Sequence, residues 1–348
     1  MTTPLFNKKS RQELIKELAN EEFNRVTVSF YRYVKIENIQ EFRDLLYKNL
    51  SYLNVLGRIY IAHEGINAQI SIPEYNEKNV VEYVNSIQYL RNIDIKKAIT
   101  EGESFYKLTI KLKDEIVAYG IDDSEYDMNV VGKHINPDDF DKYMENKNSV
   151  VVDIRNHYES EVGHFKGALI PDVERSQDLL PEVKKLLSNH KDKKILLYCT
   201  GGIRCEKASS YLLKNNFKDV NQLKGGIINY ANTIKSKKTK SNFIGKNFVF
   251  DNRLGEDVTD DIISSCHICK SKSNIHRNCS NDLCHILFIQ CDACTKKYKG
   301  CCSDKCLEYI CLTNEEQHKE KEKFLIYNKK RLGKNIKPKL YNINTDKL

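Results

Sequence analysis

Apolar positions in the first third of the chain switch repeatedly between the spacing of strands and that of helices. Residues 26–34 are rich in β-branched and aromatic side chains, whereas residues 38–52 place apolar side chains at helical intervals. The predicted elements are, in order, a strand (26–34), a helix (38–52), two strands joined by a turn at Gly65 (58–62 and 69–72), a helix (74–90) and a strand (105–112). This order is the split βαβ pattern. It predicts a ferredoxin-like (acylphosphatase-like) domain over residues 25–125, preceded by a helical lead-in over residues 1–24.

The middle of the chain alternates short apolar strands with helices. Strands are predicted at residues 149–153, 194–198 and 220–223, and Asn136 followed by Pro137 offers a helix start. Short apolar strands separated by helices indicate a parallel sheet that is covered on both faces. We therefore expect an α/β domain over residues 126–234.

The last third of the chain is more polar. Residues 235–246 carry five lysines and predict a basic linker, which leads into a Cys-rich domain that ends near residue 312. Residues 313–348 form a charged tail. The basic residues expected there to contact an anionic partner are Lys319, Lys329, Lys330, Arg331, Lys334, Lys337 and Lys339.

Composition narrows the class of protein. The chain has 348 residues, of which 40% are hydrophobic, and no run of 18 apolar residues, so we expect several globular domains and no membrane span. The polar start lacks an apolar signal core, which predicts a cytoplasmic protein. The formal net charge of +8 is compatible with nucleic acid as a partner, but a Lys-rich composition alone explains it equally well.

The most informative stretch is a thiol loop at residues 199–204. A predicted buried strand ends at Cys199, Gly201 and Gly202 allow a tight turn, and a helix begins near Arg204. A thiol at this place lies outside the carboxyl end of a parallel strand, where open α/β sheets build their sites. Backbone amides, the helix N-terminus and the arginine all favour negative charge. The loop formed by Cys199, Thr200, Gly201, Gly202, Ile203 and Arg204 therefore predicts a nucleophilic thiolate or a bound persulfide.

The loop permits other interpretations. Cys199 as an inert core thiol would need neither a Gly-Gly turn nor an arginine at a helix start. Cys205 is either a resolving thiol for Cys199 or a packing residue of the first helical turn. A phosphatase loop would place its arginine six positions after the cysteine, whereas Arg204 follows Cys199 by five.

Ten of the twelve cysteines lie between Cys266 and Cys311. Two Cys-x2-Cys pairs separated by 21 residues resemble the spacing of zinc ribbons, so we expect Cys266, Cys269, Cys291 and Cys294 at one zinc ion. Cys279, Cys284, Cys302 and Cys306 form a second candidate set. Such thiolate sites are closed, which predicts a structural metal. The alternatives are an iron–sulfur cluster and a set of reduced or disulfide-linked cysteines.

Several motifs together resemble a rhodanese domain. They are Val152-Asp153-Ile-Arg155 with Glu159, Gly163-His164-Phe-Lys-Gly167-Ala168, Pro171, the Cys199 loop and Leu223-Lys-Gly-Gly226. More narrowly, residues 61–69, 151–159 and 198–208, extended by residues 248–251 and 300–303, resemble the bacterial rhodanese-containing tRNA uridine hydroxylases. The resemblance covers about residues 25–311.

The resemblance implies oxidation of the wobble uridine of tRNA, at position 34, to 5-hydroxyuridine with O2 as co-substrate. It implies that Cys199 is the active cysteine and a persulfide carrier, with Asp153 and Arg155 as supporting residues beside the loop, where a structural ion pair is the simpler role. His63, Glu64 and Asn67 match the amino-terminal motif, either as a turn or as an RNA-facing group. Hydroxylation with O2 normally needs a redox centre, and the sequence carries no Gly-x-Gly-x-x-Gly fingerprint and identifies no electron donor.

The expected partner is the anticodon loop of tRNA, with no membrane and no protein partner inferred. The ferredoxin-like unit has the topology of an RNA-recognition module, but Gln69-Ile-Ser-Ile lacks the stacking rings expected on its third strand. Contact with the RNA backbone through residues 235–246, the Cys-rich knuckles and the tail lysines is therefore the stronger expectation. Two other functions stay open: a thiosulfate or persulfide sulfurtransferase, and a non-enzymatic RNA-binding adaptor.

Overall fold

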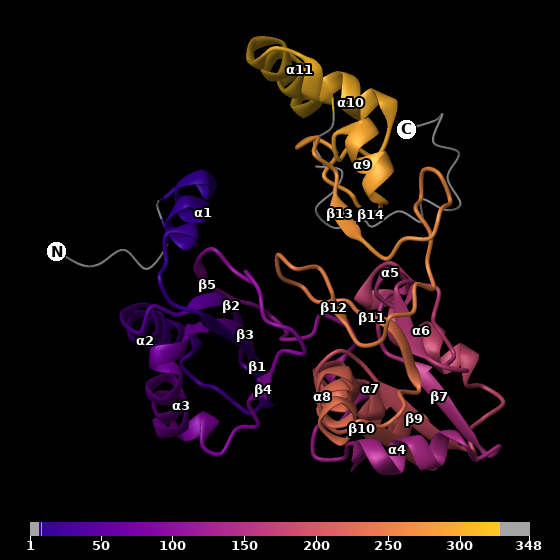
Figure 1. Ribbon diagram of the computed structural model, residues 1–348. Coiled ribbons are helices and arrows are strands. Elements are labelled where there is room, and N and C mark those ends of the chain that lie inside the picture. Colours follow the sequence, from indigo (N-terminus) through magenta and orange to yellow (C-terminus); the bar gives the residue numbers. More distant parts are fainter. Residues whose placement is uncertain (1–6, 8, 328–348) are drawn as a thin grey trace.

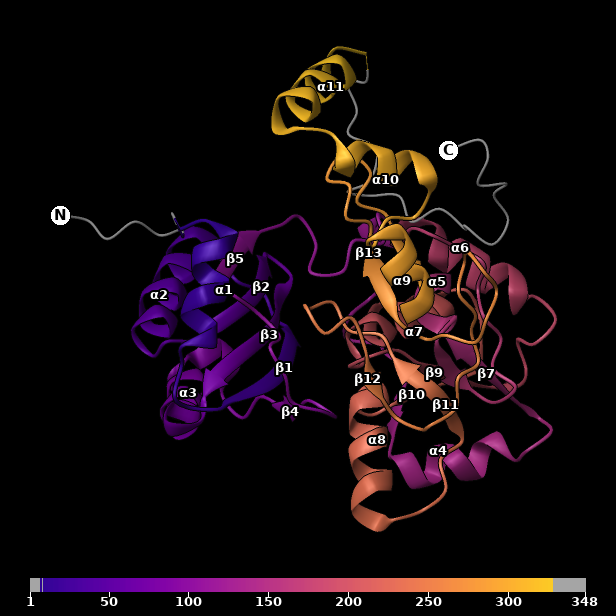
Figure 2. The same cartoon turned by 45° about the horizontal axis from the view of Figure 1, so that its top comes forward.

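The computed structural model describes Asn7 and residues 9–327, which form three units (Figure 1). The N-terminal unit and the central unit lie side by side, and the tilted view of Figure 2 shows the same arrangement. The Cys-rich unit sits on the central unit, with the last described helix at its far end. Within the described part of the chain, no helix has both the length and the apolar character needed to cross a bilayer.

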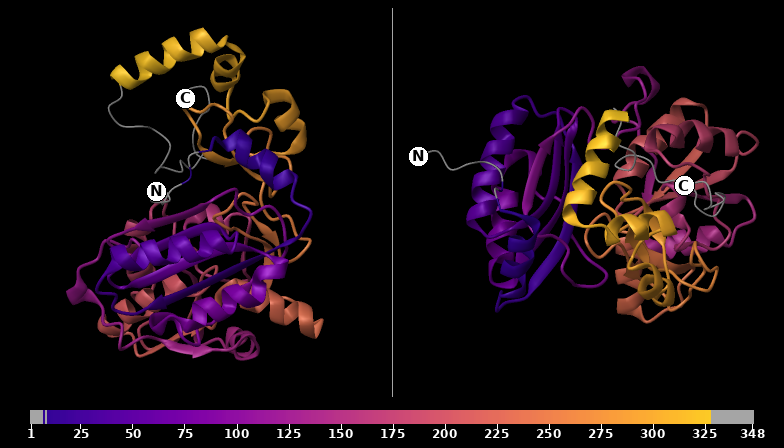
Figure 3. Two further views of the ribbon diagram at one scale, coloured as in Figure 1. Left: turned by 90° about the vertical axis from the view of Figure 1, so that its left-hand side faces the viewer. Right: turned by 90° about the horizontal axis from the view of Figure 1, so that it is seen from above.

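The N-terminal unit is a five-stranded sheet with two helices on one face. Its elements are α1 (Arg11–Ala19), β1 (Arg25–Tyr33), α2 (Ile39–Tyr52), β2 (Leu56–Ala62), β3 (Gly65–Pro73), 3-10 turn η1 (Glu74–Asn76), α3 (Glu77–Ser86), η2 (Gln88–Leu90), β4 (Lys96–Lys97) and β5 (Leu108–Leu112). The strand order is β4-β1-β3-β2-β5. The apolar sides of α2 and α3 pack on the sheet, and the side view of Figure 3 shows both helices in front of it. The ferredoxin-like expectation is confirmed.

The predicted fourth strand is placed differently from the expectation. The segment at residues 105–112 becomes β5, which pairs parallel to β2 rather than lying next to β1. The position beside β1 is taken by β4, where only Val28↔Lys97 and Ser29↔Lys96 pair. A two-residue strand is too short for an alternating apolar pattern to reveal it.

The central unit is a four-stranded parallel sheet in the order β6-β10-β9-β7. Its elements are η3 (Asp123–Glu125), β6 (Lys133–Ile135), α4 (Pro137–Met144), β7 (Ser149–Asp153), α5 (His157–Ser160), β8 (Gly163–Phe165), α6 (Ser176–Leu186), β9 (Lys194–Tyr198), α7 (Ile203–Lys214), β10 (Asp219–Leu223) and α8 (Gly226–Lys237). One apolar core joins the sheet to α6 and α7, and another joins it to α4 and α8. The predicted parallel sheet with helices on both faces is therefore confirmed.

The segment expected to be a basic linker is largely regular structure. Helix α8 continues to Lys237, and β11 (Phe243–Asn247) pairs with β8 and with β12 (Glu256–Asp257). Lys237 forms an ion pair with Asp138, and Lys246 forms one with Asp257. The prediction of a linker rested on the number of lysines. It overlooked the apolar side chains between them, such as Phe243, which is part of the core.

The Cys-rich unit holds little regular structure. It contains β13 (His276–Asn278), β14 (Leu287–Ile289), α9 (Asp292–Tyr298) and α10 (Asp304–Cys311), followed by α11 (Asn314–Tyr327). Lys319 lies on α11, whereas Lys329, Lys330, Arg331, Lys334, Lys337 and Lys339 lie outside the described residues.

Candidate active site

The thiol loop joins β9 to α7 at the carboxyl end of the parallel sheet. Cys199 follows β9 directly, and Gly202, which precedes α7, has a left-handed φ of 101°. This conformation turns the Gly202 N–H towards the thiol, and the N–H donates to Cys199 Sγ at 3.1 Å. A side chain at position 202 would be strained at this φ and would meet the Tyr31 hydroxyl at 2.8 Å.

The loop lowers the pKa of the Cys199 thiol to about 6. Burial alone raises this pKa. A hydrogen bond from Cys205, the Arg204 charge and the backbone amides of Arg204 and Gly202 outweigh burial. Because Cys205 is itself buried beside that sulfur, its own pKa lies well above the usual value. At neutral pH the pair therefore consists of one thiolate and one thiol.

The first residues of α8 hold the thiol loop through backbone hydrogen bonds, which a glycine at the start of this helix makes possible. Gly226 has a φ of 65°, and the N–H groups of Ile227 and Ile228 donate to the carbonyls of Cys199 and Thr200 at 3.0 and 3.1 Å. A Cβ at position 226 would lie 2.5 Å from the Cys199 carbonyl oxygen. This contact explains why the second residue of the Gly225-Gly226 pair is a glycine.

Arg204 is paired with a buried carboxylate, which the sequence did not reveal. Its guanidinium binds both oxygens of Glu159 at 2.6 and 2.8 Å, and Glu159 has no exposed surface. It also donates to Thr200 Oγ1 at 3.1 Å. The positive charge that favours the thiolate is thus part of a fixed ion pair rather than free for an anion. Glu159 stands in a quoted motif, but no spacing rule connects it to a residue 45 positions away.

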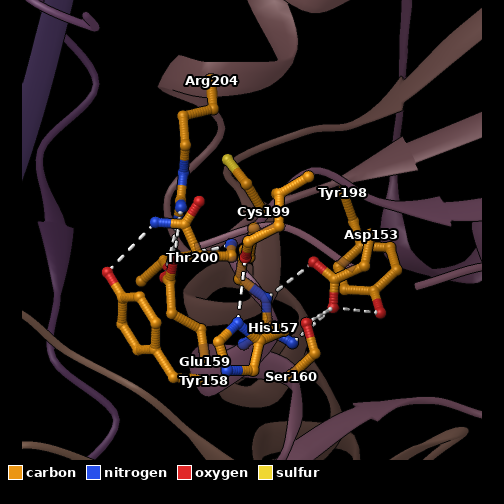
Figure 4. A network of polar contacts seen from close by, with 12 residues as sticks. Asp153, His157, Tyr158, Glu159, Ser160, Tyr198, Cys199, Thr200 and Arg204 are labelled. Atoms are coloured by element: carbon orange, nitrogen blue, oxygen red, sulfur yellow. Dashed lines mark hydrogen bonds and ion pairs between the residues drawn. The ribbon is translucent and has the colours of Figure 1, made fainter. Parts of the chain in front are cut away.

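Asp153 and Arg155 form a buried ion pair next to the thiol loop. Arg155 binds Asp153 at 2.8 and 2.6 Å, and the hydroxyls of Ser160 and Tyr198 donate to the same carboxylate. Figure 4 shows Asp153, Ser160 and Tyr198 on one side of Cys199, with Arg204 and Glu159 on the other. Neither Asp153 nor Arg155 lines the cavity described next. Their contacts hold β7, α5 and β9 together.

A cavity of about 290 Å³ lies between the thiol loop and the N-terminal sheet. Thr200, Gly201, Ile203 and Arg204 line it from the loop side. Cys199 has no exposed surface, so its sulfur lies beneath the loop rather than at the cavity surface. The sequence predicted that the thiol follows the end of a strand. It did not predict the cavity, because the opposite wall of the cavity belongs to the N-terminal unit.

The N-terminal unit is docked on α7, the helix that follows the thiol loop, through charged and hydroxyl groups. Buried Lys207 of α7 binds Glu64 at 2.8 Å and Glu115 at 2.9 Å. The Tyr31 hydroxyl donates to Glu206, the neighbour of Lys207, at 2.9 Å. Glu64 of the amino-terminal motif therefore joins the two units. Asn67 of the same motif lines the cavity, whereas the exposed His63 holds the Ile36 carbonyl with its ring at 2.9 Å.

The structure gathers eight cysteines of the Cys-rich unit into two groups of four. They are the two sets named from the spacing: Cys266, Cys269, Cys291 and Cys294, and Cys279, Cys284, Cys302 and Cys306. Within each group all sulfurs lie within 4.8 Å of one another, and each group could hold a metal ion. No disulfide joins any of the twelve cysteines. Cys301 and Cys311 belong to neither group.

Family comparisons cover all three units. Residues 25–116 match the family described as UPF0176 acylphosphatase like domain, residues 136–233 match the Rhodanese-like domain, and residues 244–307 match Rhodanase C-terminal. The central unit with its thiol loop is therefore a rhodanese-like domain.

Relatives that align with almost the whole chain define the family more narrowly. The chain is 47% identical to a tRNA uridine(34) hydroxylase of Leptospira interrogans, over 97% of this chain and 92% of that protein. It is 44% identical to proteins of the same name from Enterobacter sp. (91% of each chain) and Photorhabdus laumondii (90% of each chain). The chain belongs to the tRNA uridine(34) hydroxylase family.

Proposed function

We propose that this protein hydroxylates the wobble uridine of tRNA at carbon 5 and that Cys199 is its reactive residue. The observation that carries the proposal is a buried thiol whose pKa is lowered to about 6 by an amide-lined loop, in a chain that aligns with 92% of the length of a tRNA uridine(34) hydroxylase. A core thiol without a chemical role has its pKa raised by burial. The reaction class is that of an oxidoreductase, with O2 as co-substrate and with a requirement for an electron donor.

The buried sulfur is consistent with a persulfide carrier. A sulfur–sulfur bond is about 2.05 Å long, so a sulfane sulfur on Cys199 would extend beyond the Sγ atom. The Gly202 and Arg204 amides that stabilise the thiolate would also stabilise the anionic form of a persulfide. Cys205, whose thiol stays protonated, would act as a proton donor or a resolving thiol beside it.

The two cysteine groups are proposed to bind zinc with a structural role. The sulfurs of Cys269 and Cys291 lie 3.6 Å apart, and those of Cys302 lie 3.7 Å from Cys284 and Cys306. Sulfurs at the corners of a tetrahedron with metal–sulfur bonds of about 2.3 Å are about 3.8 Å apart. The spacing supports one metal ion per group. In an iron–sulfur cluster the four cysteines are divided between two or four irons, so some of their sulfurs would lie farther apart than the 4.8 Å within which each group falls. Elemental analysis of the purified protein distinguishes zinc from iron.

The function is tested by mass spectrometry of tRNA nucleosides. The tRNA comes from cells in which the chromosomal gene is deleted and one of three versions of the protein is supplied. Wild type and the control Cys311→Ser, an exposed cysteine outside both groups, should restore nucleosides derived from 5-hydroxyuridine. Cys199→Ser should not. If Cys199→Ser restores them fully, the proposal is wrong.

A second candidate, sulfur transfer, is favoured by the same loop. An amide cradle around a thiolate also suits thiosulfate chemistry, in which the cysteine accepts a sulfane sulfur. Cyanide-dependent formation of thiocyanate measures this activity. Thiocyanate production together with unchanged oxidised uridines in the deletion strain would favour the sulfurtransferase over the hydroxylase.

A further inference from the structure

The cavity beside the thiol loop has its opposite wall on the open face of the N-terminal sheet. Helices α2 and α3 cover the other face of this sheet. Arg58 and Tyr60 of β2 and Asn67 and Gln69 of β3 line the cavity. The volume of about 290 Å³ is close to the lower end of small-ligand pockets. The wall is therefore polar and aromatic, although it belongs to a domain whose own core lies on the other side.

Strand register sets these four side chains in two rows. Arg58 is the cross-strand partner of Gln69, and Tyr60 is the partner of Asn67. Because alternate residues of a strand face the same side, all four side chains share the cavity face. The arrangement places the Arg58 cation beside the Gln69 carboxamide and the Tyr60 ring beside the Asn67 carboxamide.

Hydrogen-bonding capacity is left over on this wall. Gln69 Nε2 donates to Asn67 Oδ1 at 2.5 Å, and Asn67 Nδ2 lies 3.5 Å from the Ile116 carbonyl oxygen. Gln69 Oε1 has no hydrogen-bond partner among the described residues, and each carboxamide has a further N–H. The pair of amides can therefore accept one hydrogen bond and donate others to a ligand in the cavity.

The arginines that line the cavity differ in whether their charge is free to bind a ligand. Arg204 is bound to Glu159, and Arg253 is bound to Asp251 and Glu256. Arg58 forms no ion pair with any described residue, and its guanidinium donates only to the backbone carbonyl of Phe250 at 3.1 Å. A ligand with a negative group therefore finds its available counter-charge at Arg58.

Phe250 completes the cavity with an exposed ring. Its side chain is 45% exposed although it lines the cavity, and the Arg204 guanidinium lies 5.8 Å from the ring centroid. An exposed phenylalanine beside a polar pocket is a suitable surface for stacking a nucleic-acid base.

We infer that this cavity binds the uracil of a single unstacked uridine nucleotide and reads its base. Gln69, held by Asn67, hydrogen-bonds the Watson–Crick edge, Phe250 and Tyr60 contact the base faces, and Arg58 binds a backbone phosphate. The inference rests on the proposed function, which requires a uridine beside Cys199, and it adds the residues that select and orient that base. Asn67 and Gln69 are thus positioning residues rather than catalytic ones.

The carboxamide chemistry separates uracil from cytosine. Uracil offers an acceptor at O4 and a donor at N3, and one carboxamide can satisfy both at once. Cytosine offers a donor at N4 and an acceptor at N3, so the same carboxamide must turn round and lose its bond to Asn67. A carboxylate at position 69 can only accept, which suits the amino group of cytosine and removes the donor to O4.

The test measures binding of two RNA hairpins with an anticodon-type loop that differ only in uridine or cytidine at the wobble position. The protein carries Cys199→Ser so that no turnover occurs. The uridine hairpin should bind more tightly, and Gln69→Glu should weaken its binding roughly tenfold and remove or reverse the preference. Arg58→Gln should weaken both hairpins by a similar factor and lower the salt dependence, because a phosphate contact carries no sequence information.

Gln88→Glu, an exposed change of the same kind outside the cavity, is the matched control and should leave the preference intact. Equal binding of both hairpins, or a Gln69→Glu variant that keeps the preference, would overturn the inference. These results leave the proposed function untouched, because that function is tested separately by the nucleosides of cellular tRNA.

Discussion

The cysteines of this chain occupy two contrasting environments. In the central unit a single thiolate is stabilised by backbone amides, a neighbouring thiol and the charge of Arg204, all supplied by the fold. In the Cys-rich unit, sulfurs gather in fours, the second group within a small apolar cluster that includes Ile286 and Phe288, and a metal ion would supply the stabilisation. The difference teaches that a lone thiolate stabilised by the fold suits chemistry, whereas thiols gathered in fours suit the binding of a metal ion. What distinguishes the two is the number of sulfurs that share a site.

Metal removal should separate the two environments most strongly. Structural zinc contributes on the order of 10 kcal/mol to the folding of small metal-binding units. A strong chelator should therefore abolish hydrogen-exchange protection of residues 266–311 while α7 and β9 keep theirs. Unchanged protection in both regions, or a purified protein that contains no metal, would contradict the assignment of the cysteine groups.

Glu159→Gln should damage the thiol loop while sparing the Cys-rich unit. The change keeps the shape of the side chain but leaves the Arg204 guanidinium buried without its counter-ion, which costs about 3–5 kcal/mol. Chemical denaturation measures the free energy of unfolding. Glu182→Gln is the control, since its partly exposed pair with Lys185 should contribute less than about 1 kcal/mol. Equal effects of the two changes would refute the role given to Glu159.

Gly226→Ala should have a smaller effect on the same loop. Its left-handed φ and the 2.5 Å approach of a Cβ to the Cys199 carbonyl predict a loss of about 1–3 kcal/mol. Gly201→Ala adds a methyl group that meets nothing within 4 Å, so its effect should stay within about 0.5 kcal/mol. Thermal melting of the two variants compares these losses directly. A Gly226→Ala variant as stable as Gly201→Ala would show that the loop does not need a glycine at this position.

Features that depend on nearby residues could be predicted from the sequence. The strand, turn and helix around Cys199 and the Cys-x2-Cys knuckles are local patterns, and the structure contains them. The cavity could not be predicted, because Arg58 meets Phe250 across 192 residues and belongs to a different unit. The pairing of Glu159 with Arg204 could not be predicted either, because the two residues are 45 positions apart. Nor could the short strand β4, which takes the place beside β1.

The most direct test of the central claim is a pH titration of the Cys199 thiolate. The ultraviolet absorbance of wild type minus that of Cys199→Ser isolates this sulfur from the other cysteines. Because the folded protein lowers the pKa, the thiolate signal should rise with pH through a midpoint of about 6 and stay constant above neutrality. A midpoint of about 8.5, the usual pKa of an unperturbed cysteine thiol, would contradict the account.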